Sequence, residues 1–328
     1  MPSPDLFFDT IFAFQKSTAL ASAIDLDLFT AMSDGASTAA EIARACGVPE
    51  RGIRILCDYL TSIEFLTKAD ARYALTPMSA AFLSKRSPAY LGGTTAFLYS
   101  PQLREDFARL TETIRHGTAG TGVMADDHPV WVNFARAMTP MMVPPAHAMA
   151  GILGVEGAGK MRVLDIAAGH GIFGIAIAQH NPQAQVVGLD WDAVLAVARE
   201  NAAALGVGDR YTTLPGSAFT VDWGTGFDLV LLPNFLHHFD RETNVTLLRK
   251  SAAALNPGGR VAILEFSPDE SRVRPAFPAR FALVMLANTS GGDAYTALEL
   301  EAMVREAGFA SVQTQALDGP QTVVVGTR

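Results

Sequence analysis

Cysteine is scarce in this chain, with only Cys46 and Cys57 among 328 residues. Two cysteines cannot build a disulfide framework, and both lie in apolar segments with helical spacing, so a reducing cytoplasm is the expected location. The chain also lacks an opening in which basic, apolar and small residues follow one another, so no secretion leader is expected.

Long apolar runs and an excess of positive charge are missing as well. Charged residues, Gly or Pro interrupt each apolar stretch before the roughly 20 residues that a membrane-spanning helix requires, so we expect no membrane span. Asp and Glu number 33 against 25 Lys and Arg, which leaves a net charge of −8. Because an acidic chain is not attracted to a phosphate backbone, nucleic acid is a poor candidate partner.

Apolar residues are plentiful, at 49% of the chain against 18% for charged residues. This composition supports large cores, and 328 residues exceed the usual size of one domain, so two units are expected. Residues 5–32 place apolar side chains at helical spacing, Thr38 and Glu41 have the spacing of a capping box, and "TKADARYALTP" indicates a short hairpin. Helices followed by a hairpin are typical of a winged-helix domain.

Winged-helix domains bind DNA or mediate assembly, and the charges here favour assembly. In the second helix of the pattern Arg51 and Arg54 are basic, but Glu50, Asp58 and Glu64 cancel most of their attraction for phosphate. A regulator that binds DNA and senses a nucleotide is therefore a disfavoured interpretation.

A loop and an unusual helix are expected in the middle of the chain. Residues 117–129, rich in Gly, Ala and Asp, indicate the loop. The helix after it, "VWVNFARAMTPMMVPPAHAMAGIL", carries aromatic and Met residues at nearly helical spacing but is interrupted by Pro140 and by the pair Pro144 and Pro145. Such Met-rich stripes either fill a core or wall a pocket, and the sequence leaves both open.

From residue 161 onward strand-like and helix-like segments alternate, which predicts a parallel sheet with helices on both faces. The last two strands, "ASVQTQAL" and "QTVVVGTR", are separated only by "DGP", so they must pair antiparallel. The expected fold class is α/β. It consists of a mostly parallel seven-stranded sheet ending in an antiparallel hairpin, preceded by the helical, winged-helix domain.

Residues 163–174, "VLDIAAGHGIFG", begin inside the first of these strands and contain Gly169, Gly171 and Gly174 in the spacing G-x-G-x-x-G. Such glycines let the backbone turn tightly and approach a nucleotide, and the spacing alone suggests a dinucleotide such as NAD. Asp165 favours another ligand, because a carboxylate repels a pyrophosphate but attracts an amino group and a sulfonium.

With these motifs the chain resembles the class I S-adenosylmethionine-dependent methyltransferases. Within that class it is similar to the caffeic acid and hydroxyindole O-methyltransferases, which carry an N-terminal winged-helix dimerisation domain. The resemblance covers nearly the whole chain. It implies a homodimer with a dimerisation domain at 1–100, a helical linker at 101–158 that contributes to the acceptor pocket, and a cofactor-binding catalytic domain at 159–328.

The motifs for S-adenosylmethionine follow the first three strands of the sheet. Asp190, in "VVGLDW", stands where a carboxylate can accept both ribose hydroxyls of adenosine. The segment "LPGSAF" resembles the family's Gly-Asp-x-Phe segment beside adenine, with Ser217 in place of Asp and so without a charge-assisted hydrogen bond. The resemblance implies the following cofactor-binding residues: Asp165, Ala167, Gly169, Gly171, Asp190, Trp191, Gly216, Ser217, Ala218, Phe219 and Asn234.

The segment "LLPNFLHHFD" is similar to the family's Leu-His-Asp-Trp pattern, which falls on residues 236–239 and implies that His237 is the catalytic base. A phenol, with a pKa of about 10, is a poor nucleophile until a group that titrates near neutrality takes its proton. Glu265, in "VAILEF", matches the carboxylate that orients the imidazole. The family's second carboxylate is replaced by Ala294 in "GGDAYT", and whether Asp293 substitutes for it stays open.

The acceptor is expected to be a small, aromatic molecule in a mostly apolar pocket with few polar anchors. Two segments would form that pocket, the helix after the predicted loop and "FALVMLANTSGGDAY", which also holds Phe281. By resemblance, Met285 clamps the substrate. The candidate acceptor residues are Trp131, Phe134, Met138, Met285, Asn288 and Tyr295.

The favoured function is transfer of a methyl group to a hydroxyl, with His237 and Glu265 as the catalytic residues. One alternative is methyl transfer to carbon, which a metal at His237 and His238 could assist. Neighbouring imidazoles point in different directions, so no metal is expected. The other alternative is a family member that uses the same pocket for decarboxylation, hydroxylation or ring closure without methyl transfer.

Overall fold

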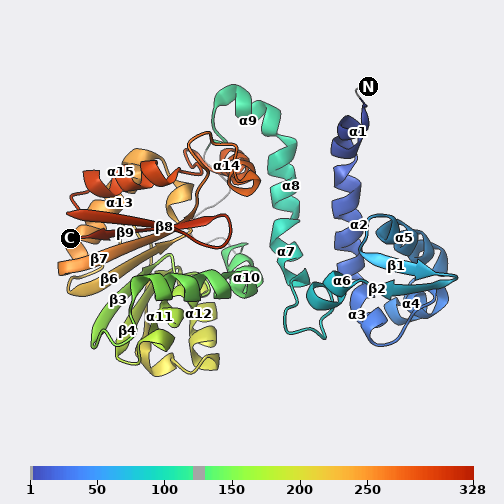
Figure 1. Cartoon of the computed structure of the whole chain (residues 1–328), viewed down its shortest axis with the longest axis horizontal. Coiled ribbons are helices and arrows are strands. Elements are labelled where there is room, and N and C mark those ends of the chain that lie inside the picture. Colours follow the sequence, from blue (N-terminus) through green and yellow to red (C-terminus); the bar gives the residue numbers. More distant parts are fainter. Residues whose placement is uncertain (1–2, 121–129) are drawn as a thin grey trace. The chain divides into compact units, whose positions relative to one another are not determined.

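The computed structural model describes residues 3–120 and 130–328. The chain divides into two compact units, Met1–Ser100 and Pro101–Arg328, each of which is described by itself (Figure 1). Part of the predicted loop, residues 121–129, lies outside the described residues. Within the described part of the chain, no helix is long and apolar enough to cross a membrane.

The N-terminal unit is a set of short helices with one hairpin. The predicted capping box is confirmed, since Thr38 and Glu41 bond each other's backbone N–H groups, and Gly47 ends that helix with φ +68°. The predicted hairpin forms as two antiparallel strands. The elements are α1 (Asp5–Ile11), α2 (Ala13–Asp25), α3 (Leu28–Ser33), α4 (Ala39–Cys46), α5 (Glu50–Ser62), β1 (Leu66–Ala69), β2 (Arg72–Leu75), α6 (Pro77–Phe82), η1 (Gly92–Thr94) and α7 (Thr95–Leu98).

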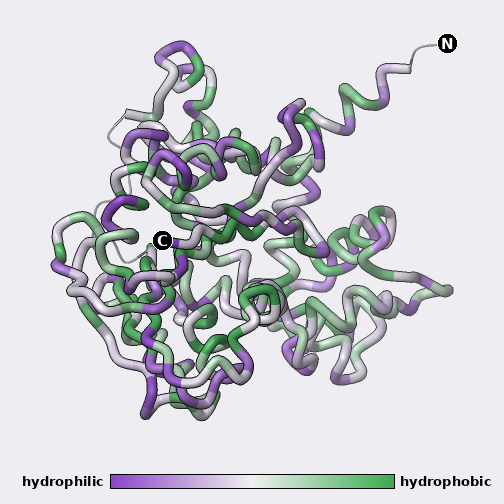
Figure 2. The backbone as a smooth tube through the Cα atoms, turned by 60° about the vertical axis from the view of Figure 1, so that its left-hand side comes forward, coloured by the Kyte–Doolittle hydropathy of each residue, from purple (hydrophilic) through white to green (hydrophobic). Residues whose placement is uncertain are grey.

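The core of this unit lies among α2 to α5 and the hairpin, where Leu28, Phe29, Ile42 and Leu60 are almost fully buried. By contrast, α1 carries apolar side chains that its own unit leaves in water, and apolar residues recur along it in Figure 2. Leu6 is 79% exposed and Phe7 is 61% exposed. So much exposed apolar surface on one short helix marks an interaction surface.

The C-terminal unit is built on a seven-stranded sheet in the order β5-β4-β3-β6-β7-β9-β8. β3 to β7 pair in parallel, while β9 is antiparallel to both β7 and β8. The predicted fold class is therefore confirmed, including the terminal hairpin. The strands are β3 (Met161–Ile166), β4 (Ala184–Asp190), β5 (Tyr211–Pro215), β6 (Phe227–Pro233), β7 (Leu255–Phe266), β8 (Ser311–Ala316) and β9 (Gln321–Thr327).

Helices cover both faces of the sheet (Figure 1). One core lies between the sheet and α10, α11 and α12, and the other lies between the sheet and α13 and α15. Successive residues of β3, such as Val163 and Leu164, enter opposite cores, because successive side chains of a strand point to opposite faces of the sheet. The helical elements are α8 (Pro101–Ala108), α9 (Leu110–His116), α10 (Val130–Leu153), α11 (Ile172–His180), α12 (Asp192–Ala204), η2 (Gly208–Arg210), η3 (Leu236–His238), α13 (Arg241–Ala254), α14 (Ala276–Asn288) and α15 (Ala297–Glu306).

The predicted interruption of α10 by proline is wrong, because α10 is one helix of 24 residues with Pro140, Pro144 and Pro145 inside it. Each proline removes one backbone N–H donor from the helix. Burial offsets this loss: Ala146, Met149 and other residues of the helix lie in the core against α11. The sequence spacing located the helix, but its continuity depends on tertiary packing.

Candidate active site

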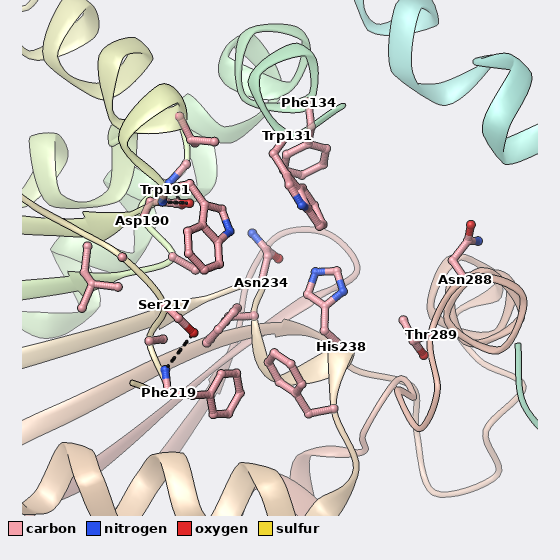
Figure 3. A pocket seen from close by; sticks show the side chains of 18 of the residues that line it. Trp131, Phe134, Asp190, Trp191, Ser217, Phe219, Asn234, His238, Asn288 and Thr289 are labelled. Carbon is pink, nitrogen blue, oxygen red and sulfur yellow. Dashed lines mark hydrogen bonds between the residues drawn. The ribbon is translucent and has the colours of Figure 1, made fainter. Parts of the chain in front are cut away.

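A cavity of about 290 Å³ opens at the carboxyl ends of the parallel strands, where open α/β sheets bind their ligands (Figure 3). The turns after β3, β4, β5 and β6 form its floor, and the ends of α10 and α14 complete it. It is lined by Trp131, Phe134, Ala167, Gly169, Leu189, Asp190, Trp191, Val194, Gly216, Ser217, Ala218, Phe219, Asn234, Phe235, His238, Phe239, Asn288, Thr289 and Ser290.

Two residues of the cavity floor hold left-handed backbone without being glycine. Ala167 follows β3 with φ +52°, and Asn234 follows β6 with φ +51°. Asn tolerates this conformation, whereas for Ala it costs about 1 to 2 kcal/mol. Such residues cluster where a chain must shape a ligand site. The Asn234 amide is held in place, since its oxygen accepts a hydrogen bond of 3.0 Å from Gln321.

Asp190 ties the glycine turn to the end of β4. One carboxylate oxygen accepts the Gly169 N–H at 2.8 Å, and the other accepts the Trp191 N–H at 2.7 Å. Burial raises the pKa of Asp190 to about 6, against the lowering effect of these two bonds. Each carboxylate oxygen has two lone pairs, so both can still accept a hydroxyl from the cavity side.

Asp165 and Gly171 do not line this cavity, unlike the other predicted cofactor residues. The Asp165 side chain is fully buried, where one oxygen accepts the Gly174 N–H at 3.0 Å and the other has no partner among the described residues. Burial raises the pKa of Asp165 well above its usual range, and the Gly174 bond offsets this only in part. A Cβ on Gly171 would come within 2.9 Å of the Tyr211 hydroxyl, so this glycine serves close packing below the turn.

The turn after β5 forms an apolar slot. The Gly216 N–H donates to the Asp190 carbonyl at 2.9 Å, which joins this turn to the end of β4. Ser217 is held locally, since its hydroxyl accepts the Phe219 N–H at 3.3 Å. Phe219 is 43% exposed, and its ring packs edge to face with that of Phe239, with the two ring centroids 5.0 Å apart. A carboxylate beside an aromatic slot fits the ribose and the purine ring of an adenosine, as in S-adenosylmethionine.

His237 and Glu265 form a buried pair behind this cavity. His237 Nδ1 lies 2.6 Å from Glu265 Oε2, and the side chains are only 6% and 2% exposed. The other oxygen, Glu265 Oε1, accepts the backbone N–H groups of Phe235, Leu236 and His237 at 2.9, 2.7 and 3.3 Å. One carboxylate at the end of β7 thus fixes both the 3₁₀ turn η3 and the orientation of the imidazole.

The neighbours of His237 are aromatic. Its ring lies 4.7 Å from Phe281, edge to face, and 4.3 Å from His238. His237 and Glu265 do not line the cavity, while His238 does. Burial, with a smaller effect of His237, lowers the pKa of His238 well below its usual range.

The Asp293 side chain contacts Arg272 and the Ala294 backbone. One of its oxygens pairs with Arg272 at 3.1 Å, and the other accepts the Ala294 N–H at 2.8 Å. Its backbone N–H donates to the His237 carbonyl at 3.0 Å. The segment therefore supports the His237 turn through its backbone.

The predicted acceptor residues divide into two groups. Trp131, Phe134 and Asn288 line the cavity. Met285 and Tyr295 are buried outside it, and the Tyr295 hydroxyl donates to the Phe239 carbonyl at 2.6 Å. Met138 packs against the core beneath the sheet. For Met138 and Tyr295, the structure favours packing over acceptor binding.

Sequence reasoning missed several lining residues, and most adjoin a predicted motif. Leu189 precedes Asp190, while Phe235 and Phe239 flank the two histidines. Thr289 and Ser290 follow Asn288, but small polar residues after a helix carry no signal of their own. Among the described residues, no group of three or more His, Cys, Asp or Glu side chains is arranged to hold a metal ion.

Two family models match the chain. The O-methyltransferase dimerisation domain matches residues 8–85, and a methyltransferase domain matches residues 164–261. The crystal structure of a candidate O-methyltransferase from Nostoc punctiforme PCC 73102 is 48% identical, with a TM-score of 0.95 and full coverage of both chains.

Two further relatives extend the match. The 3-hydroxy-5-methyl-1-naphthoate 3-O-methyltransferase of Streptomyces sahachiroi is 29% identical over 99% of this chain and 95% of its own. PigF, an S-adenosyl-L-methionine-dependent methyl transferase of Serratia sp. (strain ATCC 39006), was solved with SAH. That structure is 26% identical, with a TM-score of 0.87 and full coverage of both chains.

The sheet order and the cavity at its carboxyl edge define a Rossmann-like methyltransferase domain. The chain belongs to the S-adenosylmethionine-dependent O-methyltransferases that carry an N-terminal dimerisation domain. Its cofactor is S-adenosylmethionine. Membership of this enzyme family leaves the DNA-binding interpretation of the N-terminal unit without support.

Proposed function

We propose that this enzyme transfers a methyl group to the hydroxyl of a small aromatic acceptor, with His237 as the general base. The observation that carries the proposal is the buried contact of 2.6 Å between His237 Nδ1 and Glu265. An ionised carboxylate only accepts hydrogen bonds, so Nδ1 carries the proton in this pair, and in the neutral imidazole Nε2 then keeps its lone pair.

Glu265 performs two tasks in this proposal. Before the reaction it selects the tautomer in which Nε2 can take the proton of the acceptor hydroxyl. Afterwards its negative charge stabilises the imidazolium that has formed. Three backbone N–H groups hold its other oxygen, so the carboxylate does not need to reorganise as the charge on His237 appears.

The cavity residues would hold cofactor and acceptor side by side. When bound, S-adenosylmethionine supplies an electrophilic methyl group on a sulfonium. Asp190 would accept the ribose hydroxyls, and the slot around Ala218 and Phe219 would enclose the adenine. Trp131, Phe134 and Asn288 would bound the acceptor side, so the helical linker at 101–158 contributes to the pocket. Positioning of this kind supplies much of the rate of a bimolecular transfer.

We also propose that the enzyme is a homodimer that forms through its N-terminal domain. The exposed apolar side chains of α1 support this assembly, because a second copy could cover them. In the complete enzyme, residues 1–100 would thus serve assembly and residues 159–328 would serve binding and chemistry.

The His237→Ala variant tests the proposed function. Loss of a general base lowers methyl transfer by at least about a hundredfold. Calorimetric titration with S-adenosylhomocysteine should give an affinity within about threefold of wild type, because the proposed cofactor contacts come from Asp190, Ala218 and Phe219 and not from His237. Unchanged turnover of a true acceptor would remove His237 from the role of base.

A further inference from the structure

His238 stands at the wall of the cavity with its ring beside the candidate base. The two imidazole centroids are 4.3 Å apart, and the rings are tilted by 48°. In Figure 3 the His238 ring lies between Asn234 and Thr289 and points toward Trp131. In the family pattern the residue after the catalytic His is Asp, so this chain places a second imidazole where a carboxylate is usual.

Aromatic rings surround His238 but give its nitrogens no partner. Trp131 and Phe239 approach edge to face, with centroids at 5.8 and 6.1 Å. Within residues 3–120 and 130–328, no hydrogen bond reaches either ring nitrogen of His238. The His238 side chain is half-buried at the cavity wall, so a polar group of a ligand in the cavity can reach its ring nitrogens.

The charge state of His238 sets the kind of contact it can make. Burial and the neighbouring His237 lower its pKa well below the usual range, so the ring is neutral at neutral pH. A neutral imidazole carries one donor and one acceptor nitrogen. It can therefore accept a hydrogen bond from a hydroxyl, or donate one to a carbonyl or carboxylate oxygen.

We propose that His238 is a specificity-determining residue, whose imidazole hydrogen-bonds an oxygen that the acceptor carries next to the hydroxyl addressed by His237. The proposal rests on the proposed function, because His237 fixes where the reacting hydroxyl lies. Two imidazoles in contact can address two oxygens only when these sit on neighbouring or nearly neighbouring atoms of the acceptor. The preferred acceptors are then aromatic hydroxyls with an adjacent oxygen.

That adjacent oxygen could belong to a second hydroxyl or to a carboxylate, and the substitution of Asp by His affects the two differently. A carboxylate side chain accepts from a hydroxyl but repels a carboxylate on the acceptor. The neutral imidazole tolerates both. An enzyme with His at this position can therefore take acidic acceptors that an Asp at the same position would reject.

Binding of three naphthalenes that share one skeleton tests this assignment. The probes are 2-naphthol, 2,3-dihydroxynaphthalene and 3-hydroxy-2-naphthoate, titrated by calorimetry into the full-length protein saturated with S-adenosylhomocysteine. Because one hydrogen bond at a desolvated site contributes about 1 kcal/mol, at least one of the two-oxygen probes should bind about five- to tenfold more tightly than 2-naphthol.

Variants at His238 separate the contact from mere packing. His238→Phe keeps a ring but removes both nitrogens, so the two-oxygen probes should lose their advantage over 2-naphthol. His238→Asn should recover part of it, because its amide both donates and accepts. His238→Asp should keep any preference for the diol but bind the carboxylate probe at least about tenfold more weakly. His116→Phe makes the same change at an exposed site on α9 and should reproduce wild type.

Three results would overturn the assignment: equal binding of all three probes by wild type, an unchanged preference in His238→Phe, or no saturable binding of either two-oxygen probe. Binding tests the role of His238, whereas methyl transfer tests the proposed function, so the failure of one can be distinguished from the failure of the other. A preference that depends on His238 without methyl transfer to any probe would support the role of His238 and contradict the proposed function. Methyl transfer without such a preference would do the reverse.

Discussion

At the scale of single residues, Glu265 is the group on which the proposed chemistry depends most. Its two oxygens have different partners, since one faces three backbone N–H donors and the other faces His237 Nδ1. Both oxygens must accept hydrogen bonds if Nδ1 of His237 is to carry the proton and Nε2 is to stay basic. A carboxylate meets this requirement, because both of its oxygens accept. Glu265 is thus a positioning residue whose effect is exerted through His237.

The Glu265→Gln variant should therefore lose activity but keep its fold. The amide oxygen would turn to the three N–H donors, so the NH₂ group would face Nδ1 and impose the opposite tautomer. Methyl transfer is expected to fall by at least about a hundredfold, with S-adenosylhomocysteine affinity within about threefold of wild type. The same change at Glu156, an exposed residue after α10, is the control. Equal rates for wild type and Glu265→Gln would contradict the tautomer argument.

Asp190 gives cofactor binding a pH dependence. Because burial raises its pKa to about 6, the carboxylate gains a proton as the pH falls below that value. A protonated Asp accepts hydroxyl groups less well, so affinity for S-adenosylhomocysteine should fall about tenfold between pH 7.5 and pH 5. Calorimetry across this range should show the loss in wild type and a weaker but flat profile in Asp190→Asn. A flat wild-type profile would exclude Asp190 as the titrating group.

At the scale of elements, Tyr211 at the start of β5 packs against both Gly188 of β4 and Gly171 in the turn after β3. A Cβ on Gly188 would contact the Tyr211 hydroxyl and come within 2.9 Å of its Cζ atom. Tyr211 is 6% exposed and cannot move away without opening the core. Gly188 is thus required by packing rather than by the ligand.

Gly188→Ala should lower the free energy of unfolding by about 2 kcal/mol, the usual cost of overpacking a core. Gly151→Ala is the matched control, because Gly151 lies in α10 and, apart from the backbone of its own helix, the described residues place no atom within 4 Å of its added Cβ. That change should raise stability by about 0.5 to 1 kcal/mol. Chemical denaturation of both variants checks the pair. If Gly188→Ala were as stable as wild type, the Tyr211 side chain would be able to move away from the added Cβ, which would contradict the packing argument.

The periodic parts of this fold could be predicted from the sequence. Strand and helix alternation, the short "DGP" link and the capping box are local signals, and each is confirmed. The continuity of α10 through Pro140 could not be predicted, because it depends on burial against distant elements.

The candidate site shows the same division between local and distant causes. Motif residues at strand ends, such as Asp190 and Ser217, line the cavity because parallel strands bring their ends to one edge. Asp165 lies below the turn instead, since the direction of its side chain follows from the pleat and the packing of Tyr211. The engagement of Asp293 by Arg272 also joins residues whose contact no local pattern announces.

At the scale of the whole molecule, assembly is the proposal that the exposed surface supports. Phe7 and Phe14 are 61% and 63% exposed on the first two helices of a domain whose family model is one of dimerisation. A second copy that covers such side chains would bury aromatic anchors of the kind that dominate interfaces.

The wild-type protein should therefore have twice the chain mass of 34.9 kDa in light scattering after size exclusion. The double variant Phe7→Asp, Phe14→Asp places two charges on this surface. Its dimer dissociation constant should rise at least about a hundredfold, so that monomers form at micromolar concentration. Leu298→Asp places the same charge on an exposed apolar site of α15 and should leave the dimer intact. A monomeric wild type would contradict the assembly.

Methyl transfer to an acceptor oxygen can be followed with an isotope label. The purified enzyme is incubated with S-adenosylmethionine labelled with ¹³C in its methyl group and with the hydroxylated naphthalenes, and the product is examined by NMR. We expect a labelled methoxy carbon that is absent when His237 is replaced by Ala. A label on ring carbon, or a methoxy product formed equally well without His237, would contradict it.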